Sequence, residues 1–261
     1  MRLKRPRRSS IASASKVRVP RLYWPEPLRE GTAPLPEGAA RHLLKVLRRR
    51  DGDPVVLFDG QGQVAEGVLC DVTGAQGKIT LGPAREDRSA EPPCGLHLGL
   101  PLLRGERLDV ALQKACELGV TEITLLKTER TEVKFENGPR GGRRLAHAEG
   151  VLIHAAQQCG RTVVPTLNAP VALAPFGEQR REALKLVLDP EGRPLTREAL
   201  GMPTPREVVL LTGPEGGLSE RECEALARQG FHRWRLGNRI LRAETAPLAA
   251  LATLAVFLGD F

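Results

Sequence analysis

The residues of this chain that are best placed for chemistry lie in two turns within residues 207–246. The first turn, residues 213–217 (GPEGG), directly follows an apolar run at 208–211, and the second, residues 236–239 (LGNR), ends another strand-like run. Glycines allow backbone amide groups to approach a ligand closely. Two such turns at the ends of neighbouring strands can form one crevice, which is where open α/β sheets bind ligands.

Charged and apolar side chains follow the second turn at short spacing. Arg239 and Arg242 enclose Ile240 and Leu241, and Glu244 comes two residues later. An arginine can stabilise a developing anion, and a carboxylate can accept a proton. Each residue alone also has a structural interpretation, because Arg242 or Glu244 could form an ion pair and the GPEGG turn could simply join a strand to a helix. The two turns together are more specific than either one.

The patterns of several other kinds of site are absent from the sequence. Neither GxxxxGK[ST] nor GxGxxG occurs, so a P-loop and a dinucleotide fingerprint are excluded. The five cysteines are scattered and form no CxxC pair, which indicates reduced thiols in a cytoplasmic protein. His147 and His154 lie two helical turns apart, and we expect no metal site there.

The elements that must position the two turns alternate along the C-terminal part of the chain. Hydrophobic periodicity predicts strands at 96–100, 123–126, 184–188, 208–211 and 231–236, and helices at 107–118, 143–159 and 246–258. Ser219 and Glu222 form a capping-box pair that starts a further helix. This alternation predicts an α/β fold with a mostly parallel sheet and helices on both faces. The helix at 246–258 is apolar almost all round, so we expect it to be buried or to lie in an interface.

A different pattern occupies residues 18–88. Apolar runs at 55–58 and 63–69 flank the turn 59–62 and predict a hairpin, a further strand follows at 78–81, and one helix is expected at 38–50. These features predict a small N-terminal β-barrel. The charged and proline-containing stretch 86–93 separates it from a second domain at 94–261.

The net charge of +8 is unevenly distributed over the 261 residues. Residues 1–17 carry six basic residues and no acidic one, so the rest of the chain carries only about +2. This basic tail, which we expect to be disordered, fits an RNA-binding arm, an organelle transit peptide or a start site assigned too early. No apolar run is long enough to span a bilayer, so no membrane association is expected.

Taken together, these segments resemble a known family. The segments GPEGGLSERE at 213–222 and LGNRILRAETA at 236–246 resemble the RsmE-type rRNA methyltransferases of the SPOUT class. The resemblance extends over nearly the whole chain from residue 18, including RGER at 104–107, KTERT at 127–131, QCGR at 158–161 and HLLKVLR at 42–48. The family often has glutamates where this chain has His154 and Gln157, so a catalytic role of either carboxylate would be lost here.

The resemblance implies a fold, an activity and partners. It implies transfer of a methyl group from S-adenosylmethionine to N3 of a uridine in 16S rRNA, either free or in the small ribosomal subunit. It further implies a PUA-like RNA-binding domain, a SPOUT domain with a trefoil knot, and a homodimer with its cofactor sites near the interface. Two alternatives remain: a non-catalytic RNA-binding or ribosome-assembly factor of the same fold, and a related tRNA methyltransferase.

The same resemblance and the turn chemistry assign roles to individual residues. The residues expected to bind the cofactor are Leu188, Leu211, Gly213, Pro214, Glu215, Gly216, Gly217, Leu236, Gly237, Arg239, Ile240, Leu241 and Arg242. The residues expected to be catalytic are Arg161, Arg242 and Glu244, with the arginines stabilising a uridine anion and Glu244 acting as a base or in an ion pair. The residues expected to contact RNA are Arg18, Arg21, His42, Lys45, Arg48 and Arg130.

Overall fold

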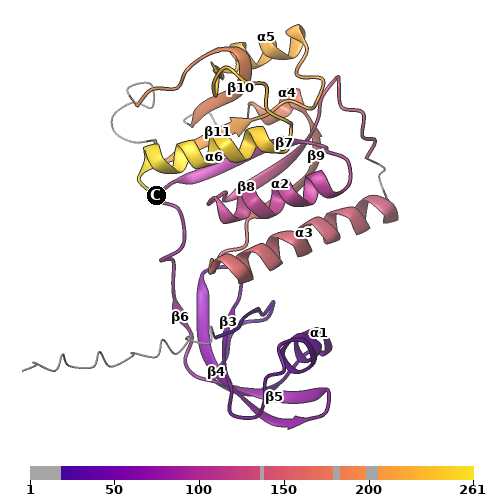
Figure 1. Cartoon of the computed structure of the whole chain (residues 1–261), viewed down its shortest axis with the longest axis vertical. Coiled ribbons are helices and arrows are strands. Elements are labelled where there is room, and N and C mark those ends of the chain that lie inside the picture. The colour runs from indigo at the N-terminus through magenta and orange to yellow at the C-terminus, as the bar shows by residue number, and fades with distance from the viewer. Residues whose placement is uncertain (1–18, 136–137, 179–182, 198–204) are drawn as a thin grey trace, which may run out of the picture.

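The computed structural model describes residues 19–135, 138–178, 183–197 and 205–261, which form two sheets with separate hydrophobic cores (Figure 1). The expectations for the basic tail 1–17 and for Arg18 lie outside the described residues. Among the described residues, no helix combines the length and the apolar character needed to cross a bilayer.

The N-terminal sheet has the order β1-β3-β4-β5-β2, with β6 paired to β4. Its strands are β1 Arg21–Tyr23, β2 Gly31–Pro34, β3 Pro54–Phe58, β4 Gln63–Thr73, β5 Gln76–Leu81 and β6 Arg85–Glu86. Strands β1 and β3 are parallel, and the other pairs are antiparallel. The β3–β4 hairpin confirms the one predicted around residues 59–62.

A short helix packs on this sheet. Helix α1 (Glu37–Ala40) continues into the π-helical segment η1 (Arg41–Val46). Leu43 and Leu44 are buried against the core of the sheet, whereas His42 and Lys45 are exposed. The helical segment ends before the predicted residue 50, and Arg48 adopts a positive φ of 54° just after it.

The C-terminal sheet has the order β12-β10-β11-β7-β8-β9, and every neighbouring pair is parallel. Its strands are β7 Gly95–Pro101, β8 Glu122–Lys127, β9 Thr166–Ala172, β10 Leu184–Arg193, β11 Glu207–Leu211 and β12 His232–Trp234. Its helices are α2 Glu106–Glu117, α3 Pro139–Cys159, α4 Leu173–Phe176, α5 Glu220–Arg228 and α6 Thr245–Leu258. The predicted α/β fold with a parallel sheet is confirmed.

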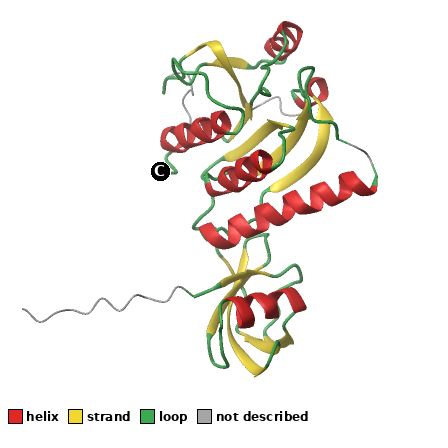
Figure 2. Cartoon of the chain, turned by 45° about the vertical axis from the view of Figure 1, so that its right-hand side comes forward, coloured by secondary structure: helices red, strands yellow, loops and turns green. Residues whose placement is uncertain are grey.

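Side-chain alternation along the strands divides the helices between the two faces of this sheet (Figure 2). Val208 and Leu210 of β11 belong to the core that includes α2, α3 and α6. Val209 and Leu211 point to the other face, into the core that includes α4 and α5. This period of two is the geometry of a strand that is buried on both sides.

Two elements in and around this sheet had no sequence prediction. Strand β9 lies at the edge of the sheet and contains an asparagine and a proline, which are depleted in strands and hid it from the periodicity analysis. Helix α4 has only four residues. Helix α3 begins at Pro139, four residues before the predicted start, because proline fits the first helical position.

Candidate active site

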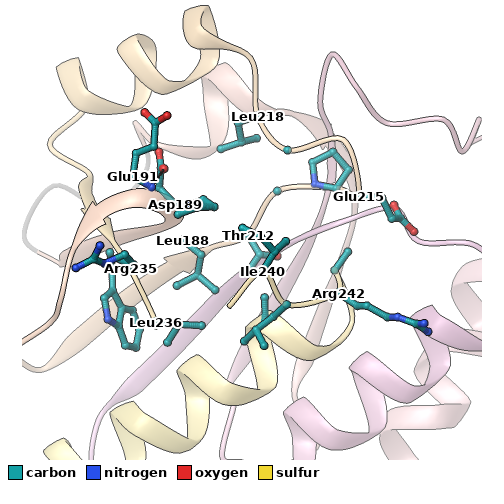
Figure 3. Close-up of a pocket in the computed structure, with 18 of the residues that line it drawn as sticks. Leu188, Asp189, Glu191, Thr212, Glu215, Leu218, Arg235, Leu236, Ile240 and Arg242 are labelled. Atoms are coloured by element: carbon teal, nitrogen blue, oxygen red, sulfur yellow. Dashed lines mark hydrogen bonds between the residues drawn. The ribbon is translucent and has the colours of Figure 1, made fainter. Parts of the chain in front are cut away.

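A cavity of about 810 Å³ opens at the carboxyl ends of three neighbouring strands, β10, β11 and β12 (Figure 3). Its walls are the second half of β10 at 188–191, the turn after β11 at 212–218, and the segment 233–243 that begins in β12. Parallel strands end at the same edge of a sheet, so segments far apart in the sequence meet there. The two turns singled out by the sequence therefore line one cavity.

The first turn has a conformation that depends on its glycines. Gly217 has a φ of +68°, and its amide donates to the carbonyl of Pro214 at 2.8 Å. A Cβ on Gly213 would lie 3.3 Å from both Cγ and the backbone nitrogen of Leu218. The turn leads into α5, whose capping box between Ser219 and Glu222 confirms the prediction. The wall of the cavity is thereby tied to the start of a helix.

The second turn carries exposed side chains beside the cavity. Gly237 has a φ of +154°, and the Ile240 side chain is 80% exposed although it lines the cavity. The carbonyl of Arg242 accepts from the amides of Thr245 and Ala246, both at 2.9 Å, and so links the residues after the turn to the start of α6. An isoleucine this exposed offers an apolar contact surface to a ligand or a partner.

Thr212 is a site residue that the sequence analysis missed. It is 1% exposed, it lines the cavity, and among the described residues its Oγ1 has no hydrogen-bond partner. Its amide donates to the carbonyl of Gly99 at 3.1 Å, which fixes the end of β11 against β7. A buried hydroxyl without a partner costs about 1–3 kcal/mol, so a polar ligand atom here would offset that cost. The available signal was a polar residue between an apolar run and the GPEGG turn.

Charged groups line the rim of the cavity. Arg233 donates to Asp189 at 2.6 Å and to Glu191 at 3.3 Å, and the hydrogen bond that Asp189 accepts raises the pKa of Arg233. On the opposite side, Arg107 of α2 donates to Glu215 of the first turn at 2.9 Å. These ion pairs hold two of the walls in place, and the sequence analysis did not anticipate Arg107 or Arg233.

Most of the residues expected to bind the cofactor lie together around this cavity. Those that line it are Leu188, Gly213, Pro214, Glu215, Gly217, Leu236, Gly237, Arg239, Ile240, Leu241 and Arg242. Leu211 requires a correction, because its side chain is fully buried in the core on the α4 and α5 face. Gly216 lies outside this cavity, and its carbonyl accepts from Arg130 Nη1 at 2.8 Å in an adjoining hollow.

The three residues expected to be catalytic lie in different places. Arg242 lines the cavity, and Figure 3 shows its side chain at the rim. Glu244 lies just beyond the lining, at the N-cap of α6, and its Oε2 is buried without a hydrogen-bond partner among the described residues. Arg161 is not a lining residue of either cavity described here.

Arg161 instead lies at the junction of the N-terminal and C-terminal sheets. Its Nη1 donates to the carbonyls of Cys116 and Val120 at 3.0 and 2.6 Å, and its Nε and Nη2 bind Glu91. The side chain is almost fully buried by these contacts. This placement corresponds to a structural role and does not bring Arg161 to the cavity, as a catalytic role would require.

The residues expected to contact RNA also separate into groups. His42, Lys45 and Arg48 are exposed on and just after η1. Arg21 lies over the ring of Phe58, 5.4 Å from its centroid, and donates to the carbonyl of Arg161 at 3.3 Å, so it belongs to the junction. Arg130 is exposed at the rim of the cavity.

The two departures from the family pattern lie on α3. Gln157 accepts a hydrogen bond from the amide of Tyr23 at 3.0 Å and joins α3 to β1. His154 is exposed. Neither residue lines the cavity. Gln157 therefore belongs to the junction and His154 to the surface.

The cavity fits the cofactor that the sequence resemblance implies. S-adenosylmethionine has an adenine ring and a charged amino-acid portion, and the lining offers apolar leucines beside charged and hydroxyl groups. The volume lies within the range of small-molecule sites. The buried Thr212 hydroxyl supplies a polar atom that such a ligand can satisfy. No group of side chains among the described residues could hold a metal ion.

Comparisons with known proteins agree with this geometry. Residues 90–255 match the family model described as an RNA methyltransferase domain. A ribosomal RNA small subunit methyltransferase E from Synechocystis is 32% identical over 93% of this chain and 79% of its own length, and one from Buchnera aphidicola is 29% identical over 94% and 99%.

A solved structure gives the same answer in three dimensions. The ribosomal RNA small subunit methyltransferase E from Neisseria gonorrhoeae, solved with S-adenosyl methionine bound, superposes with a TM-score of 0.83 and 33% identity. The match covers 92% of this chain and 98% of that one. The site, the fold and these relatives show that the chain belongs to the RNA methyltransferase family, among the ribosomal RNA small subunit methyltransferases E.

Proposed function

We propose that this chain transfers a methyl group from S-adenosylmethionine to N3 of a uridine in 16S rRNA of the small ribosomal subunit. The observation that carries the proposal is the convergence of the two glycine-containing turns on one cavity with an unpartnered buried hydroxyl at Thr212. The solved relative with the same fold binds the same cofactor.

The lining residues divide into apolar and polar groups that suit the two ends of this cofactor. Leu188, Leu236 and Leu241 would pack on the adenine, and the amides of the first turn with Thr212 would bind its polar groups. The cofactor supplies a methyl group on a sulfonium, which needs no metal. The contribution of the protein is positioning and exclusion of water, worth roughly 7–11 kcal/mol when geometry is good.

The N3 atom of uridine carries a proton that must leave. Arg242 and Arg130 lie at the rim and would stabilise the uridine anion by charge and hydrogen bonding. Glu244 is our candidate for the proton acceptor or for an ion-pair role, because its partly buried carboxylate lies two residues from Arg242 and has an oxygen without a partner among the described groups.

We further infer two domains: residues 18–88 as a PUA-like RNA-binding barrel and residues 94–261 as a SPOUT methyltransferase domain with a trefoil knot. Support comes from the separate cores of the two sheets and from the family. The exposed His42, Lys45 and Arg48 would contact rRNA phosphates. We place the enzyme in the cytoplasm, where its substrate is assembled.

A homodimer would cover exposed apolar side chains of the C-terminal segment 240–261. Ile240, Val256 and Phe261 are all well exposed, and Val256 lies on α6, which begins at Thr245 beside the cavity. A second copy packed there would shield Ile240 and place the cofactor site near the interface.

The proposal is tested by incubating the purified protein with S-adenosylmethionine and either 16S rRNA, small subunits or tRNA, followed by mass mapping of the RNA. Methylation at one uridine of 16S rRNA supports the proposal. Methylation of tRNA alone would assign a different substrate, and absence of saturable cofactor binding would point to a non-catalytic RNA-binding factor.

A further inference from the structure

We propose that the exposed face of α3 near its N-terminus, with the segment 127–135 beside it, forms a second rRNA phosphate-binding surface. It would act together with the exposed basic residues of η1. This surface, called the α3 surface below, consists of Lys127, Lys134, Arg140, Arg143 and Arg144. The inference rests on the proposed function, because it assumes that the substrate is RNA.

The charge of the α3 surface is its first supporting feature. All five side chains are exposed, and the first turn of α3 contains no acidic residue. The amino end of a helix adds partial positive charge from its free amide groups. The folded part of the chain is otherwise close to neutral, so this concentration of positive charge is local.

A shared aromatic ring holds the two parts of the α3 surface together. Lys127 Nζ lies 6.0 Å and Arg144 Cζ 5.8 Å from the centroid of the Phe135 ring. Arg144 Nη1 also donates to the carbonyl of Lys134 at 3.2 Å. These contacts attach the segment before α3 to the first turns of the helix, so the cations keep a defined spacing.

Two of the acidic groups near the α3 surface are engaged with other partners, whereas Glu129 of the segment 127–135 is exposed at the end next to Arg130. Glu132 accepts from Arg104 at 2.6 Å, and Asp109 is paired with His147 at 2.9 Å. Glu149 is the exposed acidic residue of α3 and lies more than one turn beyond Arg144. The amino-terminal part of the helix therefore presents a positive face to a polyanion.

The place of the α3 surface in the fold favours RNA over another anionic partner. At one end it continues into Arg130, which lines the cavity. At its other end α3 reaches the junction, where Gln157 binds Tyr23. In Figures 1 and 2, α3 extends from this junction toward the same side of the molecule as α1. An RNA strand that contacts both the α3 surface and the basic residues of η1 would therefore lie on the side of the molecule from which Arg130 leads to the cavity.

Phosphate contacts rather than base stacking would dominate on this surface. The exposed side chains are mainly charged or small, and the one aromatic ring, Phe135, is covered by its two cations. Phosphate contacts give affinity that falls as salt concentration rises. We therefore expect the α3 surface to contribute a salt-dependent part of the affinity for RNA without affecting the rate of methyl transfer.

The test compares two double variants. The first carries Lys134→Ala and Arg143→Ala on the α3 surface, and the control carries Arg221→Ala and Arg228→Ala on α5. Both pairs remove two exposed cations, and α5 lies at the far end of the second domain from the junction (Figure 1). We expect the first variant to bind small subunits about tenfold more weakly, with the slope of log Kd against log salt reduced by about 1–2. Its cofactor Kd and its kcat at saturating subunits should match wild type. The α5 variant should show neither change.

A charge-conserving variant, Lys134→Arg with Arg143→Lys, should bind as wild type if charge is the cause. Equal affinity and slope for wild type and the alanine variant would overturn the inference. A photocrosslinking residue at position 143 identifies the molecule that contacts the α3 surface. A crosslink to rRNA supports the inference, and a crosslink to a ribosomal protein overturns it. Absence of methylation by the wild type would contradict the proposed function. The affinity for small subunits and its salt dependence test the α3 surface independently of methylation.

Discussion

Arg161 and Glu91 form a buried ion pair that joins the segment before β7 to the loop after α3. Arg161 Nε and Nη2 donate to Glu91 Oε2 at 2.9 and 2.7 Å, while Glu91 Oε1 accepts from the amides of Thr162 and Val163 at 3.0 Å. The same loop pairs with the β3–β4 turn of the N-terminal sheet, since the amide of Gly62 donates to the carbonyl of Thr162. The pair therefore stabilises the contact between this loop and the N-terminal sheet.

Glu91→Ala should lower the free energy of unfolding by about 3–5 kcal/mol, because it leaves the Arg161 guanidinium buried without its counter-charge. Glu86→Ala, which breaks an exposed pair with Arg88, should cost less than about 1 kcal/mol. Denaturant unfolding of both variants measures the difference. Similar costs for the two substitutions would show that the buried pair has no special role.

Thr212→Val should weaken cofactor binding by about tenfold, because the cofactor loses a hydrogen bond to the Thr212 hydroxyl that is worth roughly 1–1.5 kcal/mol. The same variant without cofactor should be at least as stable as wild type, since the hydroxyl that it removes has no protein partner among the described groups. Thr212→Ser keeps the hydroxyl and should bind near the wild-type level. Calorimetric titration measures the affinities, and wild-type binding by Thr212→Val would remove Thr212 from the site.

Gly217→Val should reduce cofactor affinity at least tenfold, because φ of +68° costs a β-branched residue about 1–3 kcal/mol and the turn would change shape. Gly216→Ala is the matched control. A Cβ at Gly216 would lie 3.4 Å from Arg130 Cβ, which is ordinary contact, and Gly216 does not line the main cavity. If both variants bind the cofactor equally well, the turn does not shape the site.

Arg242→Ala should lower kcat by about 10²-fold or more with little change in cofactor Kd, because a charge facing the uridine anion acts mainly in the transition state. Arg239→Ala provides the control, as Arg239 also lines the cavity. Single-turnover rates with small subunits measure the chemical step. A loss confined to KM would assign Arg242 to RNA binding instead.

Cys159 should react with iodoacetamide at pH 7 faster than Cys223. A hydrogen bond from Cys116 lowers the pKa of the Cys159 thiol, whereas burial raises the pKa of Cys223. Both thiols are partly exposed, so the thiolate fraction decides the rate. Peptide mapping after brief labelling measures the order, and Cys116→Ala, which removes the donor, should slow labelling at Cys159. Faster labelling of Cys223 would contradict the assignment.

The sequence alone determined the class of fold and the location of the cavity walls. The apolar runs before each turn, the capping pair Ser219 and Glu222, and the glycines at 213 and 217 act over a few residues, so local propensity reveals them. The resemblance to RNA methyltransferases rests on the same local segments.

Tertiary structure decided which side chains face the cavity. Leu211 and Thr212 are adjacent in sequence, but one enters the core and the other the cavity, because successive side chains of a strand point to opposite faces. In the sequence, Arg161 and Arg242 were equally good candidates for a catalytic arginine, because each lies in a segment that resembles the methyltransferase family. The partner of Arg161, Glu91, lies 70 residues away, and only the packing of the segment before β7 against the loop after α3 brings them into contact.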